Sequence, residues 1–248
     1  MAARRGAALR LVVDEGDRPA LQIARDLALL HDGLVPTLRI YGWRPAGLTL
    51  GRFQDPAQFA VLRTAHEMVR RPTGGGAIWH EHELTYSLAI DDDVQIDSET
   101  WYARVHDAIL HALRTCGVDA TRLGEGPAHP GPRDPRVAWC FARPCRGDLI
   151  GPCGRKLCGS AMRRVRTPRA RLLMHGSLVL APPSEGVACA TVADQTDVGR
   201  VRDDLREQLA TCIARDLGLE VRRSQLDASE EAAAQTRIDE VLPHLLGR

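Results

Sequence analysis

Apolar residues along this chain recur at two different spacings. In residues 19–33 they fall on one helical stripe, which predicts a helix that Gly33 can end. In residues 84–90 every second residue is apolar, which predicts a strand. The stripe consists of Leu21, Ala24, Ala28 and Leu29, and the strand face consists of Leu84, Tyr86, Leu88 and Ile90. The chain therefore contains both helix-forming and strand-forming segments.

The remaining segments extend this mixture. Helices are predicted at 55–65 (beginning at Asp55–Pro56), 100–117, 201–218 and 230–246. Strands are predicted at 37–43 and 47–53 around the turn RPAG, at both ends of the glycine-rich stretch 68–80, and as a pair at 155–164 and 171–182. The Pro- and Gly-rich stretch 124–136 predicts a mobile loop. This order indicates a mixed α/β (α+β) fold, with mixed sheets flanked by helices, and disfavours a regular parallel βαβ array.

Composition narrows the class of protein. With 44% hydrophobic and 26% charged residues in 248, the chain fits one large globular domain, and 4% aromatic residues make its core aliphatic. A net charge of +1 provides no global field for nucleic acid or an anionic membrane. No segment approaches the roughly 20 apolar residues of a membrane span, and no secretion signal is evident. Seven scattered cysteines indicate reduced thiols in a cytoplasm.

The stretch RRPTGGGAIWH is the first candidate site. Three consecutive glycines allow the backbone to approach a ligand closely, and their amides can surround an anion. A tight hairpin turn is the simpler alternative. The pattern is neither a Walker loop nor a dinucleotide fingerprint. The neighbouring polar and aromatic residues favour a binding loop. The candidate residues are Gly74, Gly75 and Gly76 with Arg70, Arg71, Trp79 and His80.

Lys156 is the only lysine among 33 basic residues. An ammonium is compact and carries three donors, whereas a guanidinium is a wide planar fork. A single lysine in an arginine-rich chain therefore suggests a site where the guanidinium does not work. A chance remainder is the alternative. Gly154 and Gly159 flank the position and allow close approach to a ligand.

Cys140, in the triplet WCF, is open to three interpretations. A buried structural thiol is common for cysteine. A nucleophile is the second possibility, because Lys156 lies only sixteen residues further on and could stabilise a thiolate. A zinc site is the third, although the gaps between the cysteines are irregular and no C-x₂-C pair occurs. Its ligands would be Cys140, Cys145, Cys153 and Cys158.

His175 and Gly176 interrupt the apolar run LLMHGSLVL. A histidine in such a strand is more often a hydrogen-bonded structural residue than a base. The glycine indicates a bulge or the close approach of a ligand.

Together these motifs resemble one family. RRPTGGGAIWH, then LTYSL, then GRKLCGSA and then a His–Gly strand are similar in order and spacing to the lipoate–protein ligases and octanoyltransferases. YGWRPAGLTLGRFQ resembles the family's N-terminal strand pair, and the resemblance runs from about Leu11 to Ala181. It implies the mixed α/β catalytic domain that these enzymes share with biotin–protein ligases.

The resemblance also implies roles for individual residues. Lys156 would hold the carbonyl oxygen of the acyl group or, in ligases, the phosphate of the acyl-adenylate. The glycine loop would form one wall of the acyl channel, with Arg70 and His80 at its polar end. Further substrate-binding residues would be Gly159, Ser160, Ala161, His175 and Gly176. The chain departs from the family at Met162 and Met174, where glutamine is common.

The family contains two chemistries. Ligases activate lipoate or octanoate with ATP and Mg²⁺, whereas octanoyltransferases take the acyl group from acyl carrier protein without a cofactor. One transferase branch uses a cysteine in a Cys–Phe pair before the GRK motif, as in Cys140–Phe141 here, and HELTYS (82–87) also resembles this branch. The intact GGG is more typical of ligases. Both would modify a lysine of lipoyl-domain proteins.

We therefore expect an octanoyltransferase acting through Cys140 and Lys156 without a metal, with acyl carrier protein as donor and lipoyl domains as acceptors. An ATP-dependent ligase forming lipoyl-AMP is the first alternative. A non-catalytic lipoyl-domain or fatty-acyl binder is the second, and Met162 and Met174 would mark it if they filled the pocket. Residues 1–200 would form the catalytic domain and 201–248 a helical extension of it, without the accessory domain of many ligases.

Overall fold

The computed structural model describes residues 8–93, 95–124 and 138–243. Its strands are β1 (Ala8–Asp17), β2 (Thr37–Trp43), β3 (Gly47–Leu50), β4 (Met68–Arg70), β5 (Ile78–His80), β6 (Glu83–Asp91), β7 (Thr121–Arg122), β8 (Leu149–Ile150), β9 (Lys156–Val165), β10 (Arg171–Val179) and β11 (Glu220–Arg223). Its helices are α1 (Pro19–Asp32), α2 (Ala60–Arg63), α3 (Ser98–Thr115), α4 (Val198–Leu217), α5 (Ala228–Thr236) and α6 (Ile238–Val241), with 3₁₀ turns at η1 (Pro56–Phe59) and η2 (Val192–Asp194).

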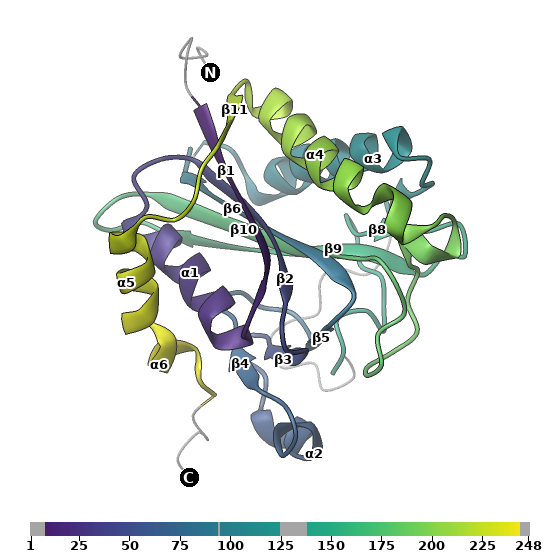
Figure 1. The fold of residues 1–248 in the computed structure, drawn as a ribbon, viewed down its shortest axis with the longest axis horizontal. Helices are drawn as coiled ribbons and strands as arrows, with labels where there is room; N and C mark the ends of the chain where they lie inside the picture. The colour runs from purple at the N-terminus through teal and green to yellow at the C-terminus, as the bar shows by residue number, and fades with distance from the viewer. Residues whose placement is uncertain (1–7, 94, 125–137, 244–248) are drawn as a thin grey trace.

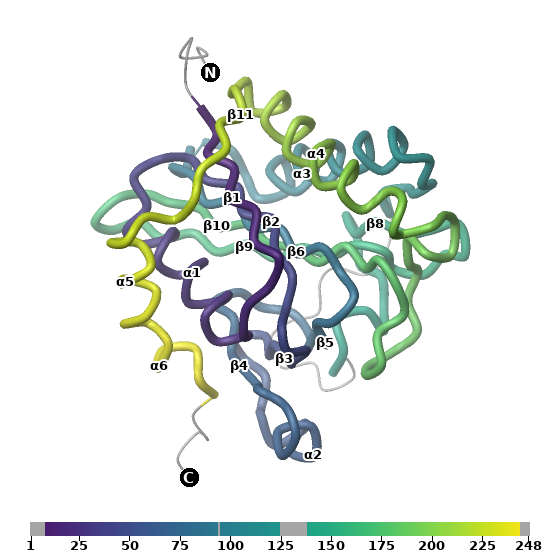
Figure 2. The backbone as a smooth tube through the Cα atoms, in the orientation of Figure 1, coloured from purple at the N-terminus to yellow at the C-terminus, as the bar shows by residue number. Residues whose placement is uncertain are grey.

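The described strands form two sheets. The larger has the order β11-β1-β2-β6-β10-β9-β8-β7, and the smaller has the order β4-β3-β5 (Figure 1). β10 pairs antiparallel with both β6 and β9, whereas β1 pairs parallel with both β2 and β11. Figure 2 shows β11, late in the chain, running alongside β1 at its start. The mixed α/β class with mixed sheets is therefore confirmed.

Helices cover both faces of the larger sheet. α3 and α4 pack side by side against one face, and α1 with α5 and α6 lies on the other, next to the smaller sheet (Figure 1). The alternation along β6 explains this arrangement, because its apolar side chains enter the core under α3 and α4. That core includes Leu84, Tyr86, Leu88, Ile109, Leu113, Leu205 and Leu209. The polar side chains Thr85 and Ser87 lie on the opposite face, also buried.

Most predicted elements are confirmed within a few residues. They are the helices at 19–33, 100–117 and 201–218, the strands at 37–43 and 84–90, and the antiparallel pair at 155–164 and 171–182. In the segment 55–65, the Asp55 side chain accepts from the amide of Ala57 and begins η1, which continues into the short α2. The loop expected at 124–136 lies outside the described residues from position 125 onward.

Three predictions need correction. The strand at 47–53 ends at Leu50, and β3 leaves β2 to join the smaller sheet. β4 and β5 do not pair with each other, because β3 lies between them, so the glycine stretch is not a hairpin turn. The helix at 230–246 breaks at Arg237 into α5 and α6, and α6 ends at Val241 because Pro243 disfavours helical backbone at Leu242. Positions 244–246 of this prediction lie outside the described residues.

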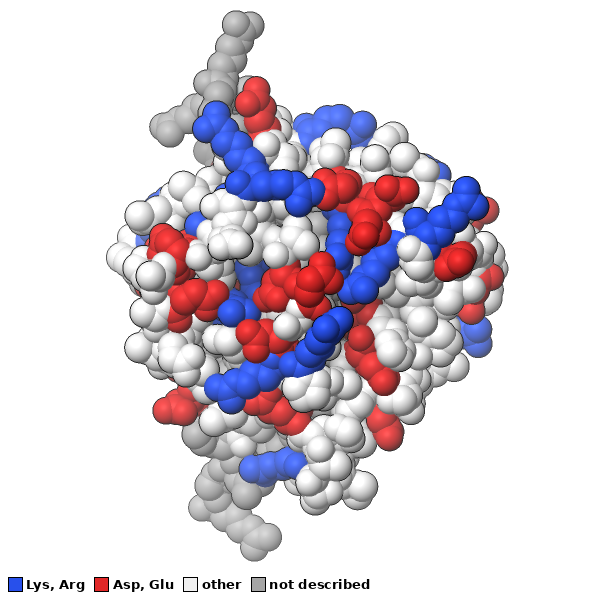
Figure 3. Space-filling view, viewed as in Figure 1, with Lys and Arg blue, Asp and Glu red and all other residues white. Residues whose placement is uncertain are grey.

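Charged side chains on the face around β1 are intermixed in sign (Figure 3). Arg10 pairs with Glu230, Arg25 with Asp14 and Arg206 with Glu15. These pairs connect β1 to α5, α1 and α4. None of the helices in the described part of the chain is long and apolar enough to cross a membrane.

Candidate active site

A pocket of about 220 Å³ lies between the larger sheet and the smaller sheet. Thr49 and His80 of the smaller sheet and Thr85 and Ser177 of the larger sheet contribute to its lining. Most residues that the sequence singles out meet here. They are Arg71, Gly74, Gly75, His80, Cys140, Lys156, Gly159, Ser160, Ala161, His175 and Gly176.

Cys140 and Lys156 are neighbours in this pocket. The Lys156 ammonium donates to the Cys140 sulfur at 3.5 Å and lies 5.4 Å from the centroid of the Phe141 ring. It also forms an ion pair of 2.8 Å with Asp148, and both charged side chains are buried. Burial alone lowers the pKa of Lys156, but negative charge at Cys140 and Asp148 outweighs burial and raises it. The ammonium therefore stays protonated, and its positive charge lies within hydrogen-bond distance of the sulfur.

Gly159 makes room for the lysine side chain. Lys156 begins β9 and its side chain folds back across this glycine. A Cβ on Gly159 would lie 2.1 Å from Cε of Lys156 and 2.4 Å from Nζ. Gly159 therefore leaves space for the Lys156 side chain in the position that it occupies beside Cys140 and Asp148.

The glycine loop holds the Cys140 segment in place. Ala77 donates its amide to the Ala138 carbonyl at 2.7 Å, and Cys140 donates its amide to the Ala77 carbonyl at 2.9 Å. A Cβ on Gly76 would lie 2.7 Å from the Cys140 nitrogen, so only glycine allows this approach. The Arg71 guanidinium fixes the loop from within by donating to the carbonyls of Gly74 at 2.8 Å and Gly76 at 2.6 Å.

Arg70, Gly76 and Trp79 lie outside the pocket lining. Arg70 donates to the carbonyls of residues 51, 52 and 54, so it supports a neighbouring turn. This corrects the prediction that Arg70 occupies the polar end of the channel. Trp79 donates to Glu81 and packs in the core of the smaller sheet.

His80 does line the pocket, but its ring nitrogens are already engaged. Nδ1 contacts the Glu83 carboxylate at 2.7 Å and Nε2 contacts the Thr49 hydroxyl at 2.8 Å, while the ring stacks on Trp43. Burial lowers the pKa of His80. Burial raises the pKa of Glu83, but the contacts with His80 outweigh burial and lower it. A neutral histidine thus donates to a buried carboxylate that the sequence analysis did not identify.

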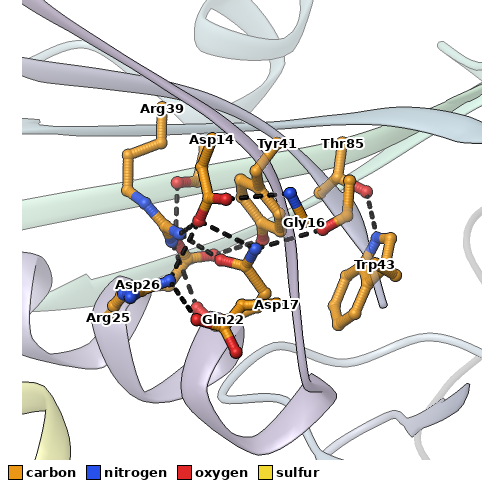
Figure 4. A network of polar contacts seen from close by, with 12 residues as sticks. Asp14, Gly16, Asp17, Gln22, Arg25, Asp26, Arg39, Tyr41, Trp43 and Thr85 are labelled. Carbon is orange, nitrogen blue, oxygen red and sulfur yellow. Dashed lines mark hydrogen bonds and ion pairs between the residues drawn. The ribbon is translucent and has the colours of Figure 1, made fainter. Parts of the chain in front are cut away.

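His175 connects the glycine loop to a buried polar network. Its Nε2 contacts the Thr73 hydroxyl at 2.7 Å and its Nδ1 contacts Asp26 at 3.3 Å. Asp26 also accepts from Arg39 at 2.5 Å and from Tyr41 at 3.0 Å, as Figure 4 shows. Burial raises the pKa of Asp26, but Arg39 and His175 outweigh burial and lower it. Of the two interpretations, the geometry supports the hydrogen-bonded structural histidine.

Ser160 is fixed by a histidine that the sequence analysis missed. Burial lowers the pKa of His106 to about 4, so its ring is neutral near pH 7. Its Nδ1 lies 2.5 Å from the Gly147 carbonyl and must carry the proton, because a carbonyl only accepts. Its Nε2 then accepts from the Ser160 hydroxyl at 2.6 Å, and Tyr86 donates to the same Ser160 oxygen at 2.5 Å.

Position in the structure distinguishes Cys140 from the other cysteines. All seven are free thiols. Burial raises the pKa of Cys145, Cys158 and Cys189, the last to about 11, which leaves them poor nucleophiles near neutral pH. Across the described residues, no three His, Cys, Asp or Glu side chains are grouped as a metal ion would require. Of these thiols, Cys140 is the one that lines the pocket beside the ammonium.

Comparison with known proteins places these features in context. Residues 18–221 match the model of the lipoyl protein ligase A/B catalytic domain. The octanoyltransferase LipM of Halalkalibacterium halodurans is 36% identical over 186 residues, covering 68% of this chain and 64% of that protein. The matched part therefore spans less than two thirds of that relative's length. The octanoyltransferase LipM of Symbiobacterium thermophilum is 31% identical and matches 92% of this chain and 93% of its own length.

Solved structures share the fold. A lipoate-protein ligase A bound with ATP superposes with a TM-score of 0.74 at 22% identity and covers 94% of this chain and 95% of its own. A putative lipoate protein ligase from T. acidophilum with bound lipoic acid gives the same TM-score and identity over 95% of each chain.

Proposed function

Because the chain belongs to the family of the lipoyl protein ligase A/B catalytic domain, we propose that it transfers an octanoyl group to a lysine of lipoyl-domain proteins through an acyl-enzyme on Cys140. The observation that carries this proposal is the 3.5 Å contact between the Lys156 ammonium and the Cys140 sulfur inside the pocket. The octanoyltransferase relatives support the choice of acyl group.

In the first half-reaction, the Cys140 thiolate attacks the carbonyl carbon of an octanoyl thioester on acyl carrier protein. A new carbon–sulfur bond forms and the oxygen becomes negatively charged, next to Lys156. Electrostatic stabilisation of such an oxyanion is worth several kcal/mol. The intermediate collapses when the carrier's sulfur leaves with the bonding electron pair and takes up the proton that Cys140 has lost.

In the second half-reaction, the ε-amine of the acceptor lysine attacks the Cys140 thioester. The carbon–nitrogen bond forms, the carbon–sulfur bond breaks and the amine releases one proton to water. Cys140 leaves as a thiolate and regains its place beside Lys156. The same ammonium therefore stabilises the oxyanion and then the leaving sulfur.

This chemistry needs neither ATP nor a metal. An ATP-dependent ligase would leave the thiol of Cys140 without a role, although the thiol lines the pocket. A non-catalytic binder would make no use of a buried ammonium held beside that thiol. Met174, which would mark such a binder, is buried in the core under α3 and α4 rather than in the pocket, whereas Met162 lines the pocket. We place the enzyme in the cytoplasm, where its seven free thiols would stay reduced.

The test is intact-protein mass spectrometry after mixing the protein with octanoyl-acyl carrier protein in the absence of ATP. We expect a mass gain of one octanoyl group that hydroxylamine removes, that a purified lipoyl domain takes over, and that is absent in Cys140→Ala. Cys189→Ala is the matched control, because it removes a buried thiol outside the pocket lining. Absence of an adduct, together with ATP-dependent transfer that survives Cys140→Ala, would show the chain to be a ligase.

A further inference from the structure

The two half-reactions place different demands on Lys156. Before acylation, the ammonium lies 3.5 Å from the Cys140 sulfur. In the proposed mechanism this sulfur is the negatively charged nucleophile, and its charge favours the charged form of Lys156. After acylation, the sulfur is part of a neutral thioester and this partner is gone. A buried ammonium without an opposite charge tends to lose its proton. Yet the second half-reaction needs the charge for the oxyanion and for the leaving sulfur.

Asp148 supplies a partner that chemistry at the sulfur does not remove. Its carboxylate lies 2.8 Å from the Lys156 nitrogen, and both side chains are almost completely buried, at 1% and 2% exposure. The Cys145 amide donates to the same carboxylate oxygen at 2.8 Å. The carboxylate is therefore positioned by the backbone independently of the lysine.

The backbone around Asp148 is itself held on several sides. The Gly147 amide donates to the Leu123 carbonyl at 2.8 Å, and the Leu123 amide donates to the Asp148 carbonyl at 2.9 Å. The Gly147 carbonyl contacts His106. This framework holds the carboxylate outside the pocket lining, which includes Lys156 and Cys140 but not Asp148.

We infer that Asp148 is a positioning residue that keeps Lys156 protonated and in place during the acyl-enzyme stage. This inference rests on the proposed function, because it assigns Asp148 to the second half-reaction of that mechanism. The raised pKa of Lys156 supports it, since Asp148 contributes to the rise together with Cys140. The other titratable groups that face the pair are Cys145, Cys158, Tyr102 and His106.

The test separates the two half-reactions in Asp148→Asn. Acylation is followed by mass spectrometry with octanoyl-acyl carrier protein, and transfer is followed in a single turnover from the isolated acyl-enzyme to a lipoyl domain. We expect acylation to change little, because the thiolate still favours the ammonium. Transfer should fall by roughly 10² at alkaline pH, where Lys156 loses its proton, and approach the wild-type rate as the pH is lowered.

Asp107→Asn is the matched control, because it removes the carboxylate of an exposed ion pair with Arg122. Asp148→Glu is the second variant, to be used if Asp148→Asn does not fold. Because it retains the negative charge, it should slow transfer by the same factor at every pH. A defect of Asp148→Asn that is equal in both half-reactions and independent of pH would overturn the inference. A wild-type protein that forms no adduct would instead overturn the proposed function.

Discussion

The space around the Lys156 nitrogen explains why a compact ammonium, and not a guanidinium, occupies position 156. Its nitrogen occupies a narrow space between the Asp148 carboxylate and the Cys140 sulfur, and its stem crosses Gly159 with no room for even one methyl group. A guanidinium would have to place a planar group of several atoms there. By contrast, Arg70 donates to three backbone carbonyls through Nη1 and Arg71 donates to two through Nη2. These guanidinium groups hold the backbone in place, whereas the ammonium lies beside the thiol.

We predict that Lys156→Ala forms the acyl-enzyme and transfers octanoate at least roughly 10²-fold more slowly, because the oxyanion loses its electrostatic partner. Lys156→Arg should fail as well, since the larger group cannot occupy the same space. Arg155→Lys is the matched control, because it exchanges one basic side chain for another at the neighbouring exposed position, outside the pocket lining. The measurement is the single-turnover rate with octanoyl-acyl carrier protein. Near-normal rates in Lys156→Arg would contradict the argument from shape.

Residues with a motif were identifiable in the sequence, and residues without one were not. The lone lysine and the Cys–Phe pair indicated Lys156 and Cys140 before the structure placed them together. Asp148 and Asp26 carry equally important contacts, but nothing in their local sequence distinguishes them from surface carboxylates. Glu83 lies in the run HELTYS (82–87), but that run does not reveal what its carboxylate contacts. Their importance arises from long-range packing. Arg70 was misassigned for the same reason, since its neighbours in the chain are site residues and its side chain points elsewhere.

At the scale of elements, the glycine loop of the smaller sheet contacts both the segment that carries Cys140 and the larger sheet. It connects β4 to β5 across β3, and its end forms hydrogen bonds with the segment that carries Cys140. The backbone-to-backbone approach at Gly76 fixes the cysteine relative to the smaller sheet. His175 contacts the same loop through Thr73 from the larger sheet. The position of the cysteine therefore depends on both sheets.

Gly76→Ala should impair acylation more than it impairs folding. The added methyl group would lie 2.7 Å from the Cys140 nitrogen and 2.8 Å from the Trp139 carbonyl carbon, so the cysteine segment must move. Gly124→Ala is the matched control, because an added Cβ there meets no heavy atom within 4 Å and the residue lies outside the pocket lining. We expect a fall of about tenfold or more in the acylation rate of Gly76→Ala, the order of effect that small misplacements of reacting groups produce. Equal rates in the two variants would show that the loop does not position the cysteine.

Elements with a strong local pattern were predictable, whereas strand pairings beyond the neighbouring pair at 155–164 and 171–182 were not. The alternation in β6 and the apolar stripe of α1 are direct consequences of burial on one face. β1 was missed because its second half is acidic, and its carboxylates make sense only with the arginines that pair with them, such as Arg25 of α1 and Arg206 of α4. The break at Arg237 is invisible in the sequence because Ala234, Ile238 and Val241 keep a helical spacing across it and all pack on α1.

At the scale of the whole molecule, the site lies where the layers meet, and this explains its many buried ionisable groups. Asp26 with Arg39 and Glu83 with His80 lie on the pocket side of the larger sheet, whereas His106 enters from α3 on the other side. Each group is satisfied by contacts from another layer, so each depends on the assembled fold. Their protonation is therefore linked to the stability of the whole molecule.

This linkage predicts that the free energy of unfolding decreases as the pH falls from about 7 to about 5. Burial lowers the pKa of His106 from its ordinary value of 6.5 to about 4 in the folded protein, so the unfolded chain binds more protons between these two values. The contribution of His106 is present above the unfolded pKa and is lost as the pH falls toward the folded pKa, and its full size is about 3 kcal/mol. His80 and His31 act with the same sign, because their pKa values are also lowered.

Urea unfolding at the two pH values measures the change in the free energy of unfolding. His106→Gln should show a smaller change than the wild type, because glutamine does not titrate, whereas His82→Gln, at an exposed position, should retain the full change. Equal pH dependence in all three proteins would contradict this prediction. It would mean that the His106 ring is protonated in the folded protein without loss of stability and is charged beside Ser160.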